Sequence, residues 1–225
     1  KEAMEKLVNA GVDAIIIAGD IFDSPVPKFE VLDQAINIFS IPKYAKSDVK
    51  VTFIEKVGDE RTEKALAGIP VFAIHGTHER RVKGEMNPVE FLERMGLLVH
   101  LHRSGVLLEK ENSRVSIFGI GGVPENLARQ IFRAWRPRPI GKSIFVFHQN
   151  LRPVVPSKDS LEIRDLPPGF DLYIDGHIHI PRVMDNILFP GSTIRTQLKK
   201  EEGSKFVWIW EDGKLSKIEL KSLRK

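Results

Sequence analysis

Four apolar runs along the chain each end in a side chain that can bind a metal ion. The runs read AIIIAGD, PVFAIHGTH, SIFVFH and DLYIDGHIH, and they end in Asp20, His78, His148 and the pair His177 and His179. A short run rich in Val, Ile and Phe and bounded by Gly or a polar residue is typical of a buried parallel strand. In open α/β sheets, ligands bind at the carboxyl ends of the strands. We therefore expect one aspartate and four histidines to gather at one edge of one sheet.

Helical periodicity separates these runs. The opening residues place Met4 and Leu7 on one face of a helix that ends near Gly11. The same periodicity predicts later helices over residues 29–39, 88–95 and 124–135. Because the first helix leads into a buried strand over residues 13–18, a crossover arrangement implies a strand before that helix. We expect this strand to lie upstream of Lys1, since the chain does not begin with Met.

Alternating and turn-flanked apolar segments predict antiparallel hairpins. The paired segments are 105–108 with 115–120 and 205–210 with 215–220, the second pair joined through Asp212-Gly213. Residues 49–54 and 187–189 are predicted to be short strands, and residues 60–67 a helical turn. Strands and helices alternate first and strands finish the chain. This order predicts an α/β fold, a layered β-sandwich of two sheets flanked by helices.

Composition narrows the class of protein. A chain of 225 residues with 42% hydrophobic and 28% charged residues is typical of one large globular domain. No apolar stretch reaches the roughly 20 residues that cross a bilayer, and no signal-peptide pattern opens the chain, so we expect no membrane association. The absence of Cys excludes disulfides and thiolate ligands and favours an intracellular, cytoplasmic location. A net charge of +4 is compatible with nucleic acid as a partner and equally with an ordinary surface.

The side chains at the strand ends indicate a particular chemistry. Imidazole together with carboxylate suits Mn, Fe, Zn or Ni better than Ca or Mg. Two ions about 3.5–4 Å apart activate a water and stabilise the oxygens of an in-line displacement at phosphorus. The residue set therefore predicts hydrolysis of a phosphate ester. Three further histidines, His75, His100 and His102, lie outside the pattern and are interpreted as surface or packing residues.

Each motif alone also has a structural interpretation. Gly19-Asp20 is a common turn pair, and a single His after a strand is often only a packing residue. In the segment Gly176–His179, two histidines flank one apolar residue and point the same way on an extended chain. The combination of all four motifs is what favours a metal site.

The order of these motifs resembles the signature of the calcineurin-like metallophosphoesterases. That family has Gly-Asp, Gly-Asn-His-Asp/Glu, a later His and Gly-His-x-His. The matching segments here are Gly19-Asp20, Gly76-Thr77-His78-Glu79, His148 and Gly176-His177-Ile178-His179. GDIFDS, HQN and PGST also resemble the archaeal DNA double-strand-break repair nucleases, the counterparts of bacterial SbcD. The resemblance covers residues 1 to about 220 and implies the calcineurin-like metallophosphoesterase fold and a metal-dependent DNA endo- or exonuclease.

The resemblance implies a role for each site residue. Asp20 would bridge two divalent metal ions, with Mn expected; His148 and His177 would bind one ion and His179 the other. His78 would stabilise the transition state or act as a general acid. Thr77 stands where the family has an Asn ligand, and its hydroxyl is a weaker donor. Because the family's Asp-x-His motif is expected upstream of Lys1, this chain is expected to bind metal weakly and to hydrolyse phosphodiesters poorly.

The resemblance also implies partners. Nucleases of this type act on DNA, form homodimers and bind a coiled-coil ATPase of the SbcC kind. Arg80 and Arg81 are candidate DNA contacts, whereas the basic segment Arg133–Arg138 is interpreted as a solvated face with Trp135 in the core. The helices after Asp20 and over residues 88–95 are candidate dimer surfaces. We expect residues 1–225 to form the metallophosphoesterase core without a capping domain.

Two other functions fit the same residues. A general phosphoesterase acting on small phosphorylated metabolites would use the same metal chemistry, so its preference for DNA over a nitrophenyl phosphate diester would separate the two. A degenerate fold that lacks the first motif and the Asn could serve as a scaffold. A scaffold has no physical need for Asp20, His78 and the three later histidines together, and the metal content of the native protein would decide the matter.

Overall fold

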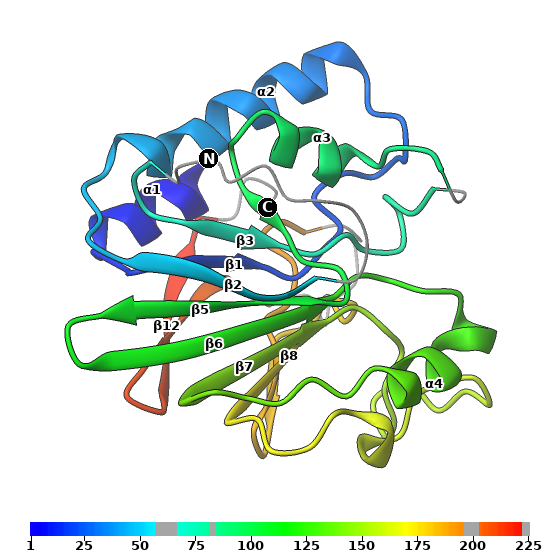
Figure 1. Ribbon diagram of the computed structural model, residues 1–225. Coiled ribbons are helices and arrows are strands. Elements are labelled where there is room, and N and C mark those ends of the chain that lie inside the picture. Colours follow the sequence, from blue (N-terminus) through cyan, green and yellow to red (C-terminus); the bar gives the residue numbers. More distant parts are fainter. Residues whose placement is uncertain (57–66, 82–83, 196–202, 222–225) are drawn as a thin grey trace.

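Two β-sheets lie face to face, with helices over their outer faces (Figure 1). The computed structural model describes residues 1–56, 67–81, 84–195 and 203–221. The layers run from helices α1 to α3, through a three-stranded sheet and a seven-stranded sheet, to helix α4. The helices are α1 (Glu2–Asn9), α2 (Phe29–Ser40), α3 (Pro88–Arg94) and α4 (Glu125–Ala134), with 3-10 turns η1 (Ile41–Tyr44) and η2 (Ile163–Asp165). No helix among these described residues is long and apolar enough to cross a membrane.

The smaller sheet is parallel and has the strand order β1-β3-β4. Its strands are β1 (Ile15–Ile17), β3 (Val71–Ala73) and β4 (Val99–His100). Ile16 pairs with Phe72, and Phe72 pairs in turn with Val99. The central strand β3 is fully buried because helices cover one of its faces and the second sheet covers the other.

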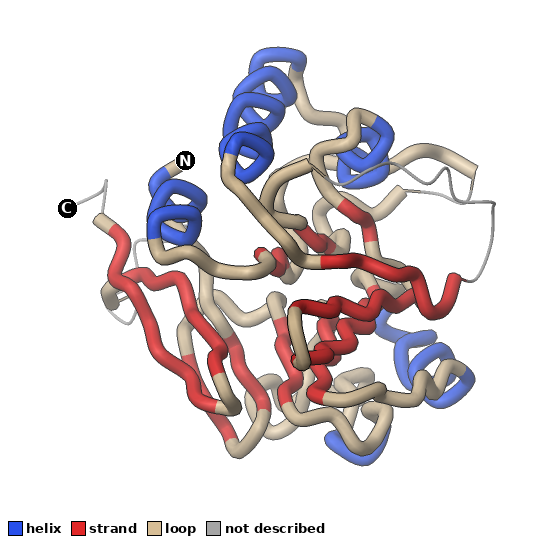
Figure 2. Tube along the Cα trace, turned by 60° about the vertical axis from the view of Figure 1, so that its left-hand side comes forward, coloured by secondary structure: helices blue, strands red, loops and turns tan. Residues whose placement is uncertain are grey.

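The larger sheet is mixed and has the order β2-β5-β6-β7-β8-β10-β9. Strands β6, β7, β8 and β10 are parallel, while both ends of the sheet are antiparallel. Its strands are β2 (Lys50–Lys56), β5 (Ser104–Lys110), β6 (Ser113–Ile120), β7 (Lys142–Phe147), β8 (Leu172–Asp175), β9 (Arg182–Met184) and β10 (Ile187–Phe189). A separate hairpin of β11 (Lys205–Glu211) and β12 (Lys214–Leu220) packs beside helix α1 (Figure 2).

The predicted elements are confirmed wherever the structure describes them, including both hairpins and the two facing sheets. The helical turn predicted over residues 60–67 falls, except for Ala67, outside the described residues. Helix α3 begins at Pro88 because Asn87 caps it: the Asn87 side chain accepts hydrogen bonds from the backbone N–H groups of Val89 and Glu90.

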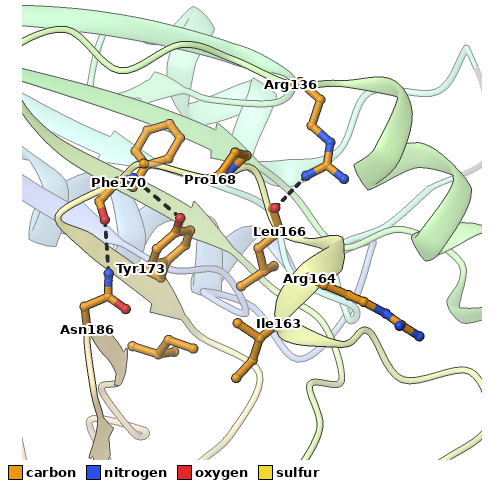
Figure 3. A pocket seen from close by; sticks show the side chains of 10 residues that line it. Arg136, Ile163, Arg164, Leu166, Pro168, Phe170, Tyr173 and Asn186 are labelled. Carbon is orange, nitrogen blue, oxygen red and sulfur yellow. Dashed lines mark hydrogen bonds between the residues drawn. The ribbon is translucent and has the colours of Figure 1, made fainter.

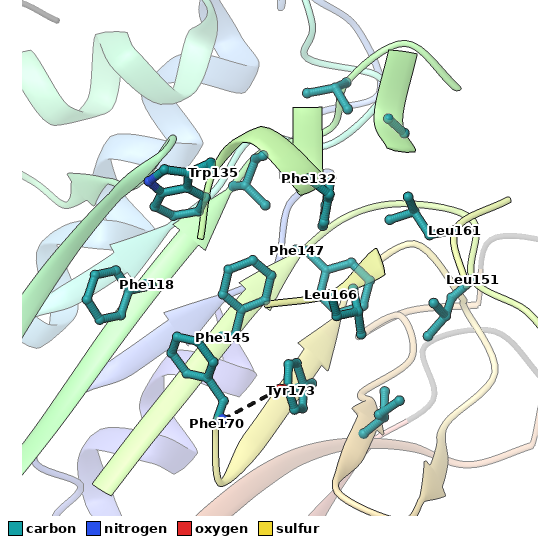
Figure 4. Close-up of a cluster of buried hydrophobic side chains, with 14 of the residues drawn as sticks. Phe118, Phe132, Trp135, Phe145, Phe147, Leu151, Leu161, Leu166, Phe170 and Tyr173 are labelled. Carbon is teal, nitrogen blue, oxygen red and sulfur yellow. Dashed lines mark hydrogen bonds between the residues drawn. The ribbon is translucent and has the colours of Figure 1, made fainter. Parts of the chain in front are cut away.

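Side chains along β7 point alternately to the two faces of the sheet, so this strand contributes to two hydrophobic cores. Ile144 and Val146 face the smaller sheet, whereas Phe145 and Phe147 face helix α4. On the α4 side, the ring centroids of Phe132 and Phe147 lie 5.9 Å apart at 80°, an edge-to-face contact (Figure 4). Trp135 is 5% exposed in this aromatic cluster, as the sequence predicted. Strand β7, which His148 directly follows, is therefore packed against side chains on both of its faces.

Replacing Phe145 by Ala should lower the free energy of unfolding by about 3–5 kcal/mol, because a fully buried ring leaves a cavity. Tyr44→Ala is the matched control, since Tyr44 is 88% exposed and its loss should cost less than about 0.5 kcal/mol. Urea denaturation of both variants measures the difference. Equal losses in the two variants would contradict the assignment of Phe145 to the core.

Candidate metal centre

The predicted site residues follow the carboxyl ends of parallel strands in both sheets. Asp20 follows β1 and His78 follows β3 in the smaller sheet, while His148 follows β7 and His177 and His179 follow β8 in the larger one. The expectation of one edge of one sheet is therefore wrong. Apolar runs identify buried strands but not their neighbours, and here β1 pairs with β3 rather than with β7.

His148 and Asp20 meet across the two sheets. The His148 Nδ1–H donates to the Ala18 carbonyl at 2.8 Å, which fixes the tautomer and leaves Nε2 with its lone pair. That Nε2 is buried, has no hydrogen-bond partner in the described structure and lies 3.1 Å from Asp20 Oδ2. Two ligands that each lie about 2.0–2.2 Å from one ion are separated by about 3 Å when they are adjacent. The pair therefore fits two ligands of one divalent ion.

The protonation states of Asp20 and His177 also suit metal binding. Burial raises the pKa of Asp20, but the hydrogen bond and charge of His148, together with the His78 backbone N–H, outweigh burial and bring it down to about 2. Asp20 in turn outweighs burial and raises the pKa of His148, so an ion competes with a proton for His148 Nε2. Burial and the neighbouring His148 lower the pKa of His177 to about 4. At neutral pH, the carboxylate is therefore anionic and the His177 imidazole is neutral, which are the forms that bind metal ions.

Glu79 ties the two loops of the smaller sheet together. Its buried carboxylate accepts hydrogen bonds from four backbone N–H groups, those of Asp20 (3.1 Å), Ile21 (2.7 Å), Phe22 (3.0 Å) and Gly76 (2.7 Å). Burial raises the pKa of Glu79 to about 6, because these N–H groups offset only part of the desolvation cost. The sequence identified Glu79 only as a motif position. Its structural task is to hold the Asp20 loop against the His78 loop.

Close backbone approach explains two glycines of the motifs. A Cβ on Gly76 would lie 2.1 Å from Asp20 Oδ1, and a Cβ on Gly176 would lie 1.8 Å from the Ala18 carbonyl oxygen. Asp20 itself has a φ of 51°, a left-handed conformation that Asp adopts more readily than most residues. These loops can reach one another only because side chains are absent at both contact points.

Asp175 is a buried site residue that sequence reasoning missed. Its Oδ1 accepts from the backbone N–H of His177 (3.1 Å) and of Gln149 (3.3 Å), so one carboxylate connects the ends of β7 and β8. Its Oδ2 has no hydrogen-bond partner in the part of the chain that is described. Burial raises the pKa of Asp175 to about 7, and His177 and His148 offset only part of that effect. The sequence could have identified Asp175, because this carboxylate ends the apolar run of β8 directly before Gly176.

His78 lies on the open side of Asp20. Its backbone N–H donates to Asp20 Oδ1 at 3.0 Å, and its Nε2 lies 3.9 Å from Asp20 Oδ2. The His78 side chain is 52% exposed, so a substrate can reach it. Thr77 precedes it on the same loop and is also exposed. The structure thus brings Asp20, His78 and His148 together.

His177 and His179 lie on the loop that follows β8. The rings of His148 and His177 pack edge to face with centroids 5.0 Å apart, and His177 Nδ1 is buried without a hydrogen-bond partner in the described residues. The His179 carbonyl accepts from the backbone N–H of Ser192 at 3.2 Å. In residues 1–56, 67–81, 84–195 and 203–221, no group of three His, Asp or Glu side chains is already arranged to hold an ion. The ligand pair Asp20 and His148 is therefore the part of the centre that fits, and the ring of His177 packs against His148 beside it.

The arginines considered as DNA contacts differ in whether their side chains already bind other groups of the protein. Arg80 is exposed, whereas Arg81 donates to the Glu85 carboxylate and to the Pro25 carbonyl. Arg133 is 54% exposed and pairs with the buried Asp165 at 2.7 Å, which agrees with a solvated face rather than a free DNA contact.

The three remaining histidines form a cluster in which His75 and His100 are buried and His102 is half-buried. His75 Nδ1 and His100 Nε2 are 2.9 Å apart, and His102 Nδ1 accepts from the Gly121 backbone N–H at 3.1 Å. Burial lowers the pKa of His75 to about 3 and that of His102 to about 4. The expectation of packing residues is confirmed, and a surface position for His75 and His100 is wrong.

A pocket of about 780 Å³ opens at the starts of β8 and β10 (Figure 3). Its arginines are engaged: Arg136 donates to the Leu166 carbonyl, and Arg164 pairs with Glu162 at 2.8 Å. The Tyr173 hydroxyl in its wall donates to the Pro167 carbonyl at 2.6 Å. Because this pocket lies beside the start of β8, it is not part of the metal centre at the end of that strand.

The fold and the strand-end ligands define a known class of protein. The chain belongs to the calcineurin-like phosphoesterase family, whose family model matches residues 1–181. Among curated proteins, it is 31% identical over 208 residues to the DNA double-strand break repair protein Mre11 of Methanopyrus kandleri, covering 84% of this chain and 41% of the relative. It is 28% identical over 230 residues to Mre11 of Archaeoglobus fulgidus, covering 92% of this chain and 46% of that protein.

A human relative matches as well. The chain is 27% identical over 234 residues to the double-strand break repair protein MRE11 of Homo sapiens, covering 86% of this chain and 32% of that protein. The chain therefore spans less than half the length of these curated relatives.

Glu79→Gln should lower the free energy of unfolding by about 1–3 kcal/mol, because an amide turns N–H donors toward backbone N–H groups. The same variant should weaken the binding of divalent metal, since the Asp20 loop loses its anchor. Urea denaturation and titration calorimetry measure the two effects. Glu85→Gln is the matched control, because Glu85 is 48% exposed and its ion pair is worth at most about 1 kcal/mol. Equal losses in both variants would refute the anchoring role.

Proposed function

We propose that the protein is a metal-dependent phosphodiesterase that cleaves DNA, as an endo- or exonuclease, in double-strand-break repair. The observation that carries this proposal is the pair His148 Nε2 and Asp20 Oδ2, which lie 3.1 Å apart and are arranged as ligands of one ion. The repair proteins among the relatives support DNA as the substrate.

The proposed centre holds two divalent metal ions, with Mn expected, between Asp20 and the histidines at 148, 177 and 179. When bound, such ions supply an activated water and neutralise the charge that develops at phosphorus. His78 is the residue of this chain that acts on the substrate. In this proposal its imidazole, which is exposed, stabilises the transition state or donates a proton to the leaving oxygen. Asp20 Oδ1 holds the His78 backbone in place, so ligand and acid are positioned by the same carboxylate.

A further strand beside β1 would complete this centre. Strand β1 pairs with β3 on one side, and its Ile16 and Ile17 are only half-buried, whereas Phe72 and Ala73 of β3 are 1% exposed. An apolar strand with one open edge is a ready partner for another strand. We propose that a strand carrying the Asp-x-His motif pairs there and completes the metallophosphoesterase core of residues 1–225.

Partners follow from the same proposal. Phe29 and Val31 on α2 and Met95 after α3 are 88%, 45% and 52% exposed, and the two helices lie side by side in Figure 1. This exposed apolar surface supports a homodimer formed through α2 and α3. A coiled-coil ATPase of the SbcC kind and DNA at Arg80 and Arg81 complete the proposed assembly, which acts inside the cell. Arg81 would have to release Glu85 before it could bind a phosphate.

Mn-dependent cleavage of linear duplex DNA tests the function, with this chain compared with a form extended at its N-terminus. The extended form should be more active, and a chelator should abolish the activity of both.

His78→Gln should lower kcat by about 10²–10⁴-fold while leaving Mn affinity unchanged, because His78 acts on the substrate and not on the metal. Arg164→Ala, in the distant pocket, is the matched control. Faster turnover of a nitrophenyl phosphate diester than of DNA, or full activity of the His78 variant, would argue against the proposal.

Thr77→Asn should raise the affinity for Mn by about tenfold, because the amide oxygen is a better neutral ligand than the hydroxyl. Titration calorimetry measures the change. Thr52→Asn, on an exposed position of β2, controls for the substitution itself. If both variants bind Mn as the parent does, Thr77 is not at the metal centre.

A further inference from the structure

Lys205 is a buried cation that touches the loop of a proposed metal ligand. It begins strand β11 and is only 3% exposed. Its Nζ donates to the His179 carbonyl at 3.3 Å and to Ser192 Oγ at 2.8 Å. Lysine is almost never fully buried unless its ammonium group is paired, because desolvation of the charge is costly. These contacts therefore fix the position of Lys205 relative to the loop.

The His179 carbonyl is held from two directions. Besides Lys205, the backbone N–H of Ser192 donates to the same oxygen at 3.2 Å. The Ser192 hydroxyl accepts from Lys205 and donates to the Ile194 carbonyl at 2.7 Å. The peptide of His179 is therefore locked to the turn over residues 190–194, and Lys205 joins the two.

A second residue of β11 holds the same turn. Trp208 Nε1–H donates to the Pro190 carbonyl at 3.1 Å. Strand β11 thus contacts both ends of the connection between His179 and Ser192. This strand lies outside residues 1–181, the part of the chain that the family model matches.

We propose that Lys205 is a positioning residue for His179, which makes the hairpin of β11 and β12 a working part of the metal centre. This inference rests on the proposed function, because His179 needs positioning only if it binds a metal ion. A ligand has to be held within about 0.5 Å of its productive place, and contacts to the peptide of His179 limit where its imidazole can lie. Without the Lys205 ammonium group, the His179 carbonyl keeps the hydrogen bond from the Ser192 N–H but loses its link to β11.

Titration of the full-length protein with Mn tests this inference by calorimetry, in parallel with the metal-free melting temperature. Lys205→Met keeps an aliphatic stem but removes every N–H donor, and it should weaken Mn binding about tenfold or more. Lys205→Arg restores the donors and should recover most of the affinity. Val207→Ala is the matched control: Val207 is buried on the same strand, so this variant loosens the hairpin without removing a contact to the loop. It should lower the melting temperature while leaving Mn affinity near that of the parent.

The outcomes separate this inference from the proposed function. Unchanged Mn affinity in Lys205→Met, or an equal loss in Val207→Ala, would overturn the positioning role while leaving the nuclease proposal intact. Weakened Mn binding in Lys205→Met together with no cleavage of DNA by any variant would support the positioning role and refute the nuclease. If the parent protein does not bind Mn, both the nuclease proposal and the positioning role of Lys205 are refuted, because each requires the metal centre.

Discussion

The hydrogen bond from His148 Nδ1 to the Ala18 carbonyl is the contact on which the metal centre depends. It joins residues 130 positions apart and links the end of β7 in one sheet to the end of β1 in the other. The bond selects the tautomer that leaves Nε2 free for a metal and places that nitrogen beside Asp20. Gly176 allows the β8 loop to approach the same Ala18 carbonyl, so the Ala18 peptide, directly after β1, is the meeting point of three motifs.

Two buried carboxylates stabilise this junction from opposite sides. Glu79 joins the two loops of the smaller sheet, and Asp175 joins the two strand ends of the larger one. Both accept from backbone N–H groups, and burial raises the pKa of each. These two carboxylates accept the backbone hydrogen bonds of the loops, while His148 Nε2 and His177 Nδ1 have no hydrogen-bond partner in the described residues.

Much of this arrangement was predictable from the sequence. Apolar runs that end in Asp20, His148 and the His177 pair identified the strands and the site, because buried strands have a distinctive composition. The division into two sheets was missed, since an apolar run does not reveal which strand lies beside it. The tasks of Asp175 and Lys205 were missed for a related reason. Their importance comes from contacts with residues distant in sequence, such as the 26 positions between Lys205 and His179.

The most direct test is a crystal structure of the protein soaked in Mn, with the ion located by its anomalous scattering. The account predicts one peak in direct contact with both His148 Nε2 and Asp20 Oδ2, with the Nδ1–H of His148 still bonded to the Ala18 carbonyl. A peak among His75, His100 and His102 with none beside Asp20 would contradict it, as would a rotated His148 ring that no longer contacts Ala18.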